Sequence, residues 1–130
     1  MAFPTELSFI ESEEAKLGVR LPADLRARLL GNNGGEIATD DEDWSLFPVF
    51  DASDRKKAAR SANHIARETQ AAREWRGFPP SAVAIARNGS GDYLVLLPSV
   101  DKPGALDKKI YLWAHETGSL TVMAEAIGEL

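Results

Sequence analysis

Two short turn-forming segments in the second half of the chain constrain its fold most, because each stands between two runs of β-forming residues. Residues 88–91, Asn-Gly-Ser-Gly, separate AVAIA (82–86) from DYLVLLP (92–98). Residues 115–118, His-Glu-Thr-Gly, separate KIYLWA (109–114) from SLTVMA (119–124). Connections this short join antiparallel neighbours, whereas parallel strands need a long crossover. The second half of the chain is therefore predicted to form four strands paired as two hairpins.

Two helices are predicted at the start of the chain. The first spans residues 8–17, with Ser8 and Glu11 in the spacing of a capping box and Gly18 at its C-terminal end. The second begins at Pro22, since the fixed φ and missing N–H of proline suit the first helical turn. Its buried face is predicted from a stripe of leucines four residues apart: Leu21, Leu25 and Leu29.

The segment Asn32-Asn33-Gly34-Gly35 must end the second helix, because Asn and Gly tolerate the left-handed backbone that reverses a chain. Extended structure is predicted next, with a strand over WSLFPVF, residues 44–50. The run of four acidic residues before it, 40–43, would repel and lose hydration in a core, so a solvated loop outside regular structure is expected.

A long helix is predicted over residues 55–75, capped by Ser53 or Asp54 and ended by the glycine and prolines of residues 77–80. Its apolar stripe is thin, so it should lie on the outside of the sheet. The stripe consists of Ala58, Ala62, Ile65, Thr69 and Ala72, with Trp75 as an anchor. The order of elements indicates one α+β domain over residues 1–130, with a mostly antiparallel sheet and flanking helices.

The composition narrows the class of protein. The chain has no cysteine, which excludes disulfides and thiolate metal sites. Neither a signal peptide nor an apolar run long enough for a membrane span is recognised in the sequence, so we expect a cytoplasmic protein. We also expect a monomer or weak homodimer. The net charge of −5 is uneven. Residues 1–54 hold twelve acids and four bases (−8), and residues 55–130 hold eight acids and eleven bases (+3).

Catalytic and cofactor signatures are missing from the sequence. Neither His64 nor His115 has a zinc-binding or nucleophile-activating pattern around it. The segment NGSGD lacks the lysine of a phosphate-binding loop, and DDED (40–43) lacks the alternating ligands of a calcium loop. The basic segment 55–76 lacks a pattern of interleaved aromatic residues, since Trp75 near its end is its one Phe, Tyr or Trp, and the whole chain is acidic. Specific nucleic-acid binding is therefore not expected. We therefore predict a protein without enzymatic activity, cofactor or metal.

Several short motifs together give the chain a resemblance to the SUKH superfamily, in particular its Smi/Knr-type branch. The motifs occur in the order Leu21-Pro22, Asn33-Gly34-Gly35, Trp44-x-Leu46, Gly91-Asp92 and Trp113-x-His115-Glu116-Thr117-Gly118. The resemblance implies an α+β fold without shared catalytic residues. It also implies, in bacteria, an immunity protein that binds and blocks a contact-delivered toxin, often a nuclease. Fungal relatives are regulators that act through partner binding, which leaves a general interaction module as the alternative.

The motif residues themselves are predicted to serve the fold, through turns and core packing. A partner surface is predicted instead in the acidic part of the chain, because an acidic inhibitor suits a basic toxin domain. Its residues are Asp40, Asp41, Glu42, Asp43, Asp51 and Asp54. The competing hypothesis places the partner on the basic segment between Arg55 and Arg76.

Overall fold

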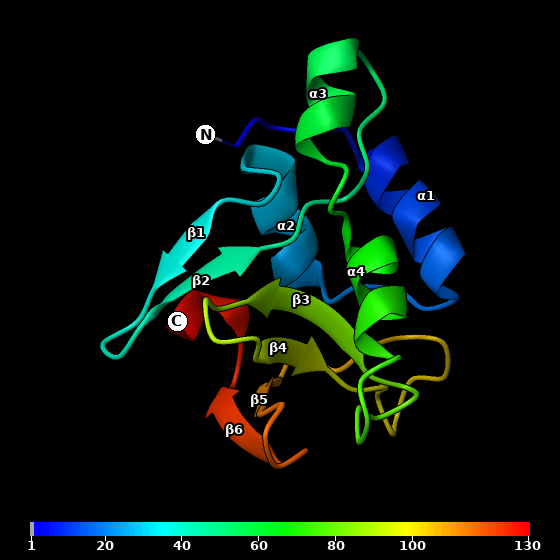
Figure 1. Ribbon diagram of the computed structural model, residues 1–130. Coiled ribbons are helices and arrows are strands. Elements are labelled where there is room, and N and C mark those ends of the chain that lie inside the picture. Colours follow the sequence, from blue (N-terminus) through cyan, green and yellow to red (C-terminus); the bar gives the residue numbers. More distant parts are fainter. Residues whose placement is uncertain (1) are drawn as a thin grey trace.

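One antiparallel sheet of six strands organises the computed structural model, which describes residues 2–130 (Figure 1). The strands follow one another in the sheet in chain order. The elements are α1 (Leu7–Leu17), α2 (Ala23–Gly31), β1 (Glu36–Ala38), β2 (Asp43–Leu46), α3 (Arg55–Arg60), α4 (Ile65–Ala72), β3 (Val83–Arg87), β4 (Tyr93–Leu96), β5 (Ile110–Trp113), β6 (Leu120–Ala124) and the 3-10 turn η1 (Ile127–Glu129). The predicted α+β class and both C-terminal hairpins are confirmed. No helix among the described residues is long and apolar enough to cross a membrane.

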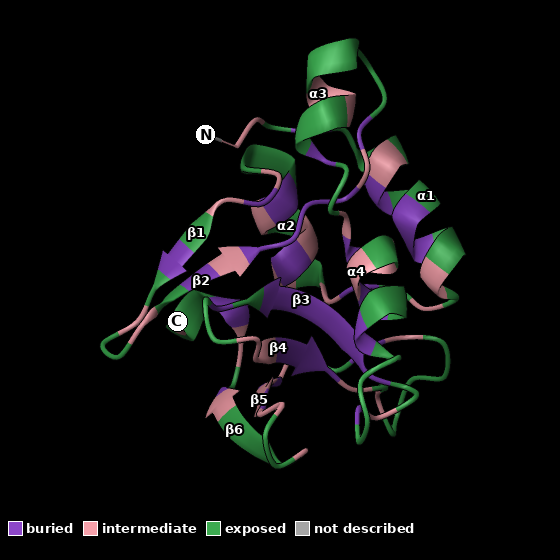
Figure 2. Ribbon diagram, in the orientation of Figure 1, coloured by how far each residue is buried: buried purple, intermediate pink, exposed green. Residues whose placement is uncertain are grey.

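The pleat divides the side chains of the sheet between two faces, named here after the helix on each. In Figure 1, α4 lies in front of β3, which it contacts, and α2 lies behind the sheet. A row of directly opposed residues crosses the α4 face: Glu36, Ser45, Arg87, Tyr93, Trp113 and Leu120. Alternate positions such as Trp44 and Leu94 are buried in the core with Leu25 of α2. Figure 2 shows this burial concentrated in β3 and β4.

The first two helices agree with the leucine pattern and with the predicted C-terminal cap at Gly18, whose φ is 76°, but not with the predicted N-terminal ends. Leu21, Leu25 and Leu29 are all buried, as expected. The helix α1 begins at Leu7, and Glu6 at its N-terminus makes no side-chain capping bond, so the capping box at Ser8 was wrong. Pro22 stands at the N-cap of α2 instead of inside its first turn.

The predicted helix over residues 55–75 is wrong, because the chain forms two short helices with a break at residues 61–64. At the break, the hydroxyl of Ser61 donates to the carbonyl of Lys57 (2.7 Å) and accepts from the backbone N–H of Asp51 (2.9 Å). These bonds hold the end of α3 against the segment before it. Ala62 is therefore exposed, contrary to the predicted stripe, and Trp75 lies beyond the end of α4.

A buried carboxylate sets the position of α4. Glu13 of α1 is completely buried, and one carboxylate oxygen accepts from the N–H of Ala66 in the first turn of α4 and contacts His64 Nδ1, both at 2.6 Å. Its other oxygen accepts from the N–H of Phe50 at 3.2 Å. A negative charge at the N-terminus of a helix is favourable, because the first N–H groups lack partners within the helix. Glu13 thus joins α1, α4 and the segment after β2.

The strand predicted over residues 44–50 is shorter, and a partner strand was missed. The strand β2 ends at Leu46, after which the chain stays buried up to Val49 outside regular structure. The missed strand is β1, which pairs with β2 in antiparallel register. Its three residues are too few to produce a recognisable alternation. Asp43 belongs to β2, which corrects the expectation that all four residues of 40–43 lie outside regular structure.

Candidate functional site

The turn of residues 32–35 determines where the β1–β2 hairpin begins. The side chain of Asn33 donates to the carbonyl of Val49 (2.9 Å) and accepts from its N–H (2.8 Å), as a neighbouring strand would. Gly34 and Gly35 have φ values of 106° and 88°, which favour glycine. A Cβ on Gly34 would also lie 3.2 Å from the carbonyl oxygen of Leu46. The turn therefore ends α2 and directs β1 along β2.

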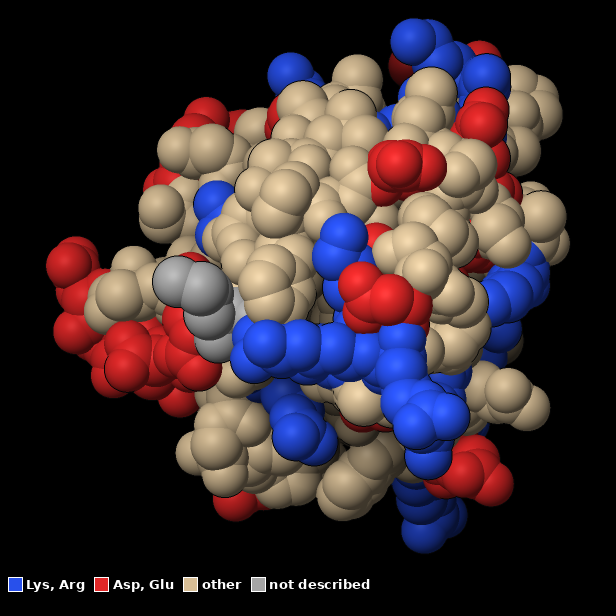
Figure 3. Space-filling view, turned by 90° about the horizontal axis from the view of Figure 1, so that it is seen from above, with Lys and Arg blue, Asp and Glu red and all other residues tan. Residues whose placement is uncertain are grey.

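The β1–β2 hairpin carries the acidic run at its tip, and we call residues 36–46 the acidic hairpin. It projects from the body of the protein in Figure 1, and Figure 3 shows acidic side chains gathered at that end. Asp40, Asp41 and Asp43 are exposed. Glu42 differs, since it is half-buried and accepts a hydrogen bond from Asn88 Nδ2 at 2.9 Å. The tip is closed by Thr39, whose hydroxyl donates to the carbonyl of Glu42 at 2.7 Å.

The other two acids of the predicted partner surface lie elsewhere. Asp51 is only 3% exposed, and its carboxylate accepts from the Thr5 hydroxyl (2.8 Å) and from the N–H and hydroxyl of Ser53 (2.9 and 2.6 Å). Burial alone raises the pKa of Asp51, but these hydrogen bonds outweigh it and hold that pKa below its usual value. Asp51 thus serves the fold, which corrects its placement on a partner surface. Asp54 is exposed and caps α3 by accepting from the N–H of Lys57 (2.8 Å).

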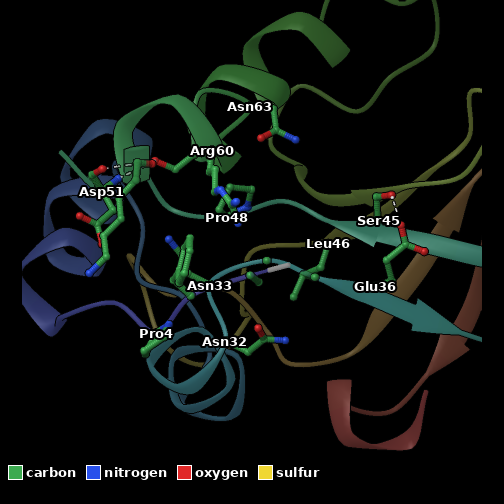
Figure 4. Close-up of a pocket in the computed structure, with 16 residues that line it drawn as sticks. Pro4, Asn32, Asn33, Glu36, Ser45, Leu46, Pro48, Asp51, Arg60 and Asn63 are labelled. Atoms are coloured by element: carbon green, nitrogen blue, oxygen red, sulfur yellow. Dashed lines mark hydrogen bonds between the residues drawn. The ribbon is translucent and has the colours of Figure 1, made fainter. Parts of the chain in front are cut away.

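An open groove of about 640 Å³ lies beside the acidic hairpin (Figure 4). Its walls come from the N-terminal segment, the turn of residues 32–35, β2, and the α3 region with the residues that follow it. Figure 4 shows the polar side chains of Asn32, Arg60 and Asn63 around this space. The guanidinium of Arg60 lies over the ring of Phe3, 4.6 Å from its centroid, and Lys56 Nζ lies 5.7 Å from it. The groove therefore separates an acidic hairpin from a basic helix.

Both histidines are held by carboxylates that stabilise the fold. His115 Nδ1 lies 2.7 Å from Asp92 Oδ1, which also accepts from the N–H of His115 at 3.1 Å. Asn88 Nδ2 donates to the other oxygen of Asp92 at 3.2 Å. Burial alone raises the pKa of Asp92, but the hydrogen bonds from His115 and Asn88 outweigh it and lower that pKa. These contacts connect the two C-terminal turns. The ring of His64 contacts Glu13, whose same oxygen accepts from the N–H of Ala66.

The remaining motif residues lie where the turns and the core need them. Gly91 has a φ of 94°, and a Cβ there would lie 3.5 Å from the His115 ring. Trp44 and Trp113 are completely buried, and the indole N–H of Trp113 donates to the carbonyl of Gly77 at 3.2 Å. Among the described residues, no group of three or more His, Cys, Asp or Glu could hold a metal ion. The acidic hairpin, the groove and the basic helix α3 are surface features among the described residues that a partner could contact.

Comparison with known proteins identifies a relationship over nearly the whole chain. The model of the SMI1 / KNR4 family (SUKH-1) matches residues 4–130. No curated protein matches the chain. The match includes all the elements of the sheet and all the motif residues discussed above.

Proposed function

Because the chain belongs to the SMI1 / KNR4 family (SUKH-1), we propose that it is a protein-binding domain without catalytic activity. More specifically, we propose an immunity protein that binds a basic toxin domain and neutralises it. The resemblance noted from the sequence motifs implies this role for bacterial members. A cytoplasmic location and a monomeric or weakly dimeric state remain predictions.

The observation that carries the proposal is the acidic hairpin. It projects from the body and exposes Asp40, Asp41 and Asp43, and no ion pair among residues 2–130 neutralises these three carboxylates. Exposed charge of one sign increases the rate at which an oppositely charged protein associates. The hairpin therefore suits a first contact with a basic surface.

The test is to remove the charge without disturbing the hairpin. We choose the triple variant Asp40→Asn, Asp41→Asn and Asp43→Asn, and keep Glu42 because it bonds Asn88. The partner is the toxin domain encoded beside this gene, first shown to bind the wild-type protein. Association should slow about tenfold and become less sensitive to salt, whereas dissociation should change little.

A matched control removes the same charge elsewhere. The exposed residues Glu11, Asp101 and Glu116 are changed to Gln, Asn and Gln, so the net charge of the two variants is equal. Equal slowing in both variants would mean that net charge, not the hairpin, attracts the partner. An unchanged association rate in the hairpin variant would remove the hairpin from the interface.

The basic helix α3 supports a second possibility, that the partner is acidic and contacts Lys56 and Arg60. Charge reversal at these positions would then weaken binding, and neutralising the hairpin would leave association unchanged or faster. The gene neighbourhood separates the two roles. An adjacent toxin gene favours an immunity protein, and an isolated gene favours a general regulatory interaction module.

A further inference from the structure

A second hollow lies on the α4 face of the sheet, next to the acidic hairpin. It has a volume of about 580 Å³, within the range of ligand-binding clefts. We call it the sheet hollow and define it by Glu36, Asp43, Ser45, Trp75, Arg87 and Tyr93. Four of these residues belong to the row of opposed side chains across β1 to β4. The hollow is therefore built from four strands and the segment after α4.

An exposed indole forms one wall of the sheet hollow. Trp75 is 46% exposed, although the other two tryptophans of the chain are completely buried. Its ring is fixed edge-on by Trp113, with centroids 6.4 Å apart, and by His115, with centroids 5.6 Å apart. Fixing the ring in advance lowers the entropic cost of using it in a contact. A tryptophan that served only core packing would expose less of its indole to water than Trp75 does.

Two carboxylates also line the sheet hollow. Glu36 of β1 and Asp43 of β2 are both exposed, and both lie on the α4 face because Glu36 is opposite Ser45 and Asp43 is two residues from Ser45. Glu36 accepts a hydrogen bond from the Ser45 hydroxyl at 3.5 Å. The negative charge of the hairpin tip thus continues into the hollow that Trp75 also lines.

From this arrangement we propose that the sheet hollow receives an arginine side chain of the partner, with its guanidinium on the indole of Trp75 and near Glu36 and Asp43. Arginine fits better than lysine, because its planar guanidinium stacks on aromatic rings and bonds carboxylates with two parallel N–H groups. The inference rests on the proposed function for the basic character of the partner. It adds a specific contact to the general attraction of the hairpin.

The positive charge of Arg87 affects how strongly this site binds a cation. This residue is exposed on β3, opposite Ser45 and Tyr93, and lines the same hollow as Trp75, Glu36 and Asp43. Its charge opposes a second cation in the hollow. Replacing it by Gln should therefore strengthen the binding of an arginine peptide, and weaker binding would count against a cation site.

The experiment uses simple peptides, so it does not depend on a known toxin. Hexa-arginine and hexa-lysine carry equal charge, and their binding to the intact protein is measured at low salt. Attraction by net charge alone should bind the two peptides equally. The sheet hollow should bind hexa-arginine about two- to fivefold more tightly than hexa-lysine. Trp75→Ala should abolish this preference. The control variant Asp40→Asn with Asp41→Asn should weaken the binding of both peptides and retain the preference for hexa-arginine.

An independent readout in the wild-type protein covers the case that Trp75→Ala folds poorly. The indole N–H resonance of Trp75 should shift on titration with hexa-arginine, whereas those of the buried Trp44 and Trp113 should not. Equal affinity for the two peptides, a preference that survives in folded Trp75→Ala, or tighter binding of hexaglutamate would overturn the inference. Asp43 belongs both to the acidic hairpin and to the sheet hollow, so the association test of the hairpin is repeated with the double variant Asp40→Asn with Asp41→Asn, which leaves the hollow intact. Slower association in that variant does not depend on the hollow, so the two proposals fail separately.

Discussion

Replacing the buried carboxylate of Glu13 should be one of the most destabilising single changes in this protein. Glu13→Ala removes the acceptor for the N–H groups of Phe50 and Ala66 and for His64 Nδ1. A buried donor that loses its partner costs about 1–3 kcal/mol. Two backbone donors therefore cost roughly 2–6 kcal/mol, before any contribution from His64 or the space left behind. That is a large part of the roughly 5–15 kcal/mol by which domains are stable.

Urea unfolding near pH 7, followed by circular dichroism, measures this loss of unfolding free energy. The control is Glu11→Gln, an exposed position on the same helix, where a change of about 0.5 kcal/mol or less is expected. Glu13→Gln should fall between the two, because one amide oxygen replaces two acceptors. If Glu13→Ala unfolds at the same urea concentration as the wild type, Glu13 does not hold α4 in place and the reasoning is refuted.

Two further predictions concern stability. Leu29→Asp places an unpaired charge on the completely buried face of α2 and should cost several kcal/mol, so an unchanged melting temperature would contradict the assigned face. The lowered pKa values of Asp51 and Asp92 stabilise the fold fully at pH values well above the ordinary aspartate pKa of 3.8, and this contribution is lost as pH falls through the lowered values. Unfolding free energy should therefore decline from about pH 5 downward. The decline should be shallower in Asp92→Asn, and an equal slope would exclude Asp92 as a cause.

Local patterns predicted the features that depend on neighbours in sequence. The C-terminal hairpins follow from short turns between β-forming runs, and the burial of Leu25 and Leu29 follows from helical periodicity. Leu21 is buried as well, although it precedes the helix. The positive φ values of Gly34 and Gly35 also follow from the backbone preference of glycine. Asn33 acts differently, through side-chain bonds to Val49, 16 residues away. For the candidate site, the acidic run 40–43 was recognised as largely exposed from its charge alone.

Contacts between distant residues determined what the patterns missed. Residues 55–75 read as one helix, but the bond from Asp51 to Ser61 and the carboxylate of Glu13 end one helix and start another. In the local sequence Asp51 resembles the exposed acids around it. In the structure, however, the hydroxyl of Thr5, 46 residues away, donates a hydrogen bond to it. Neither partner can be identified from local sequence.

The sequence by itself determined the class of fold, the order of most elements and the family, because turn chemistry, periodicity and motif order are local properties. Only the tertiary structure decided which charged residues share a surface. Glu36, Arg87 and Trp75 come together in the sheet hollow because strand register and the position of α4 place them there. Register depends on pairing between strands far apart in the chain, and a shift of one residue would turn every side chain to the opposite face.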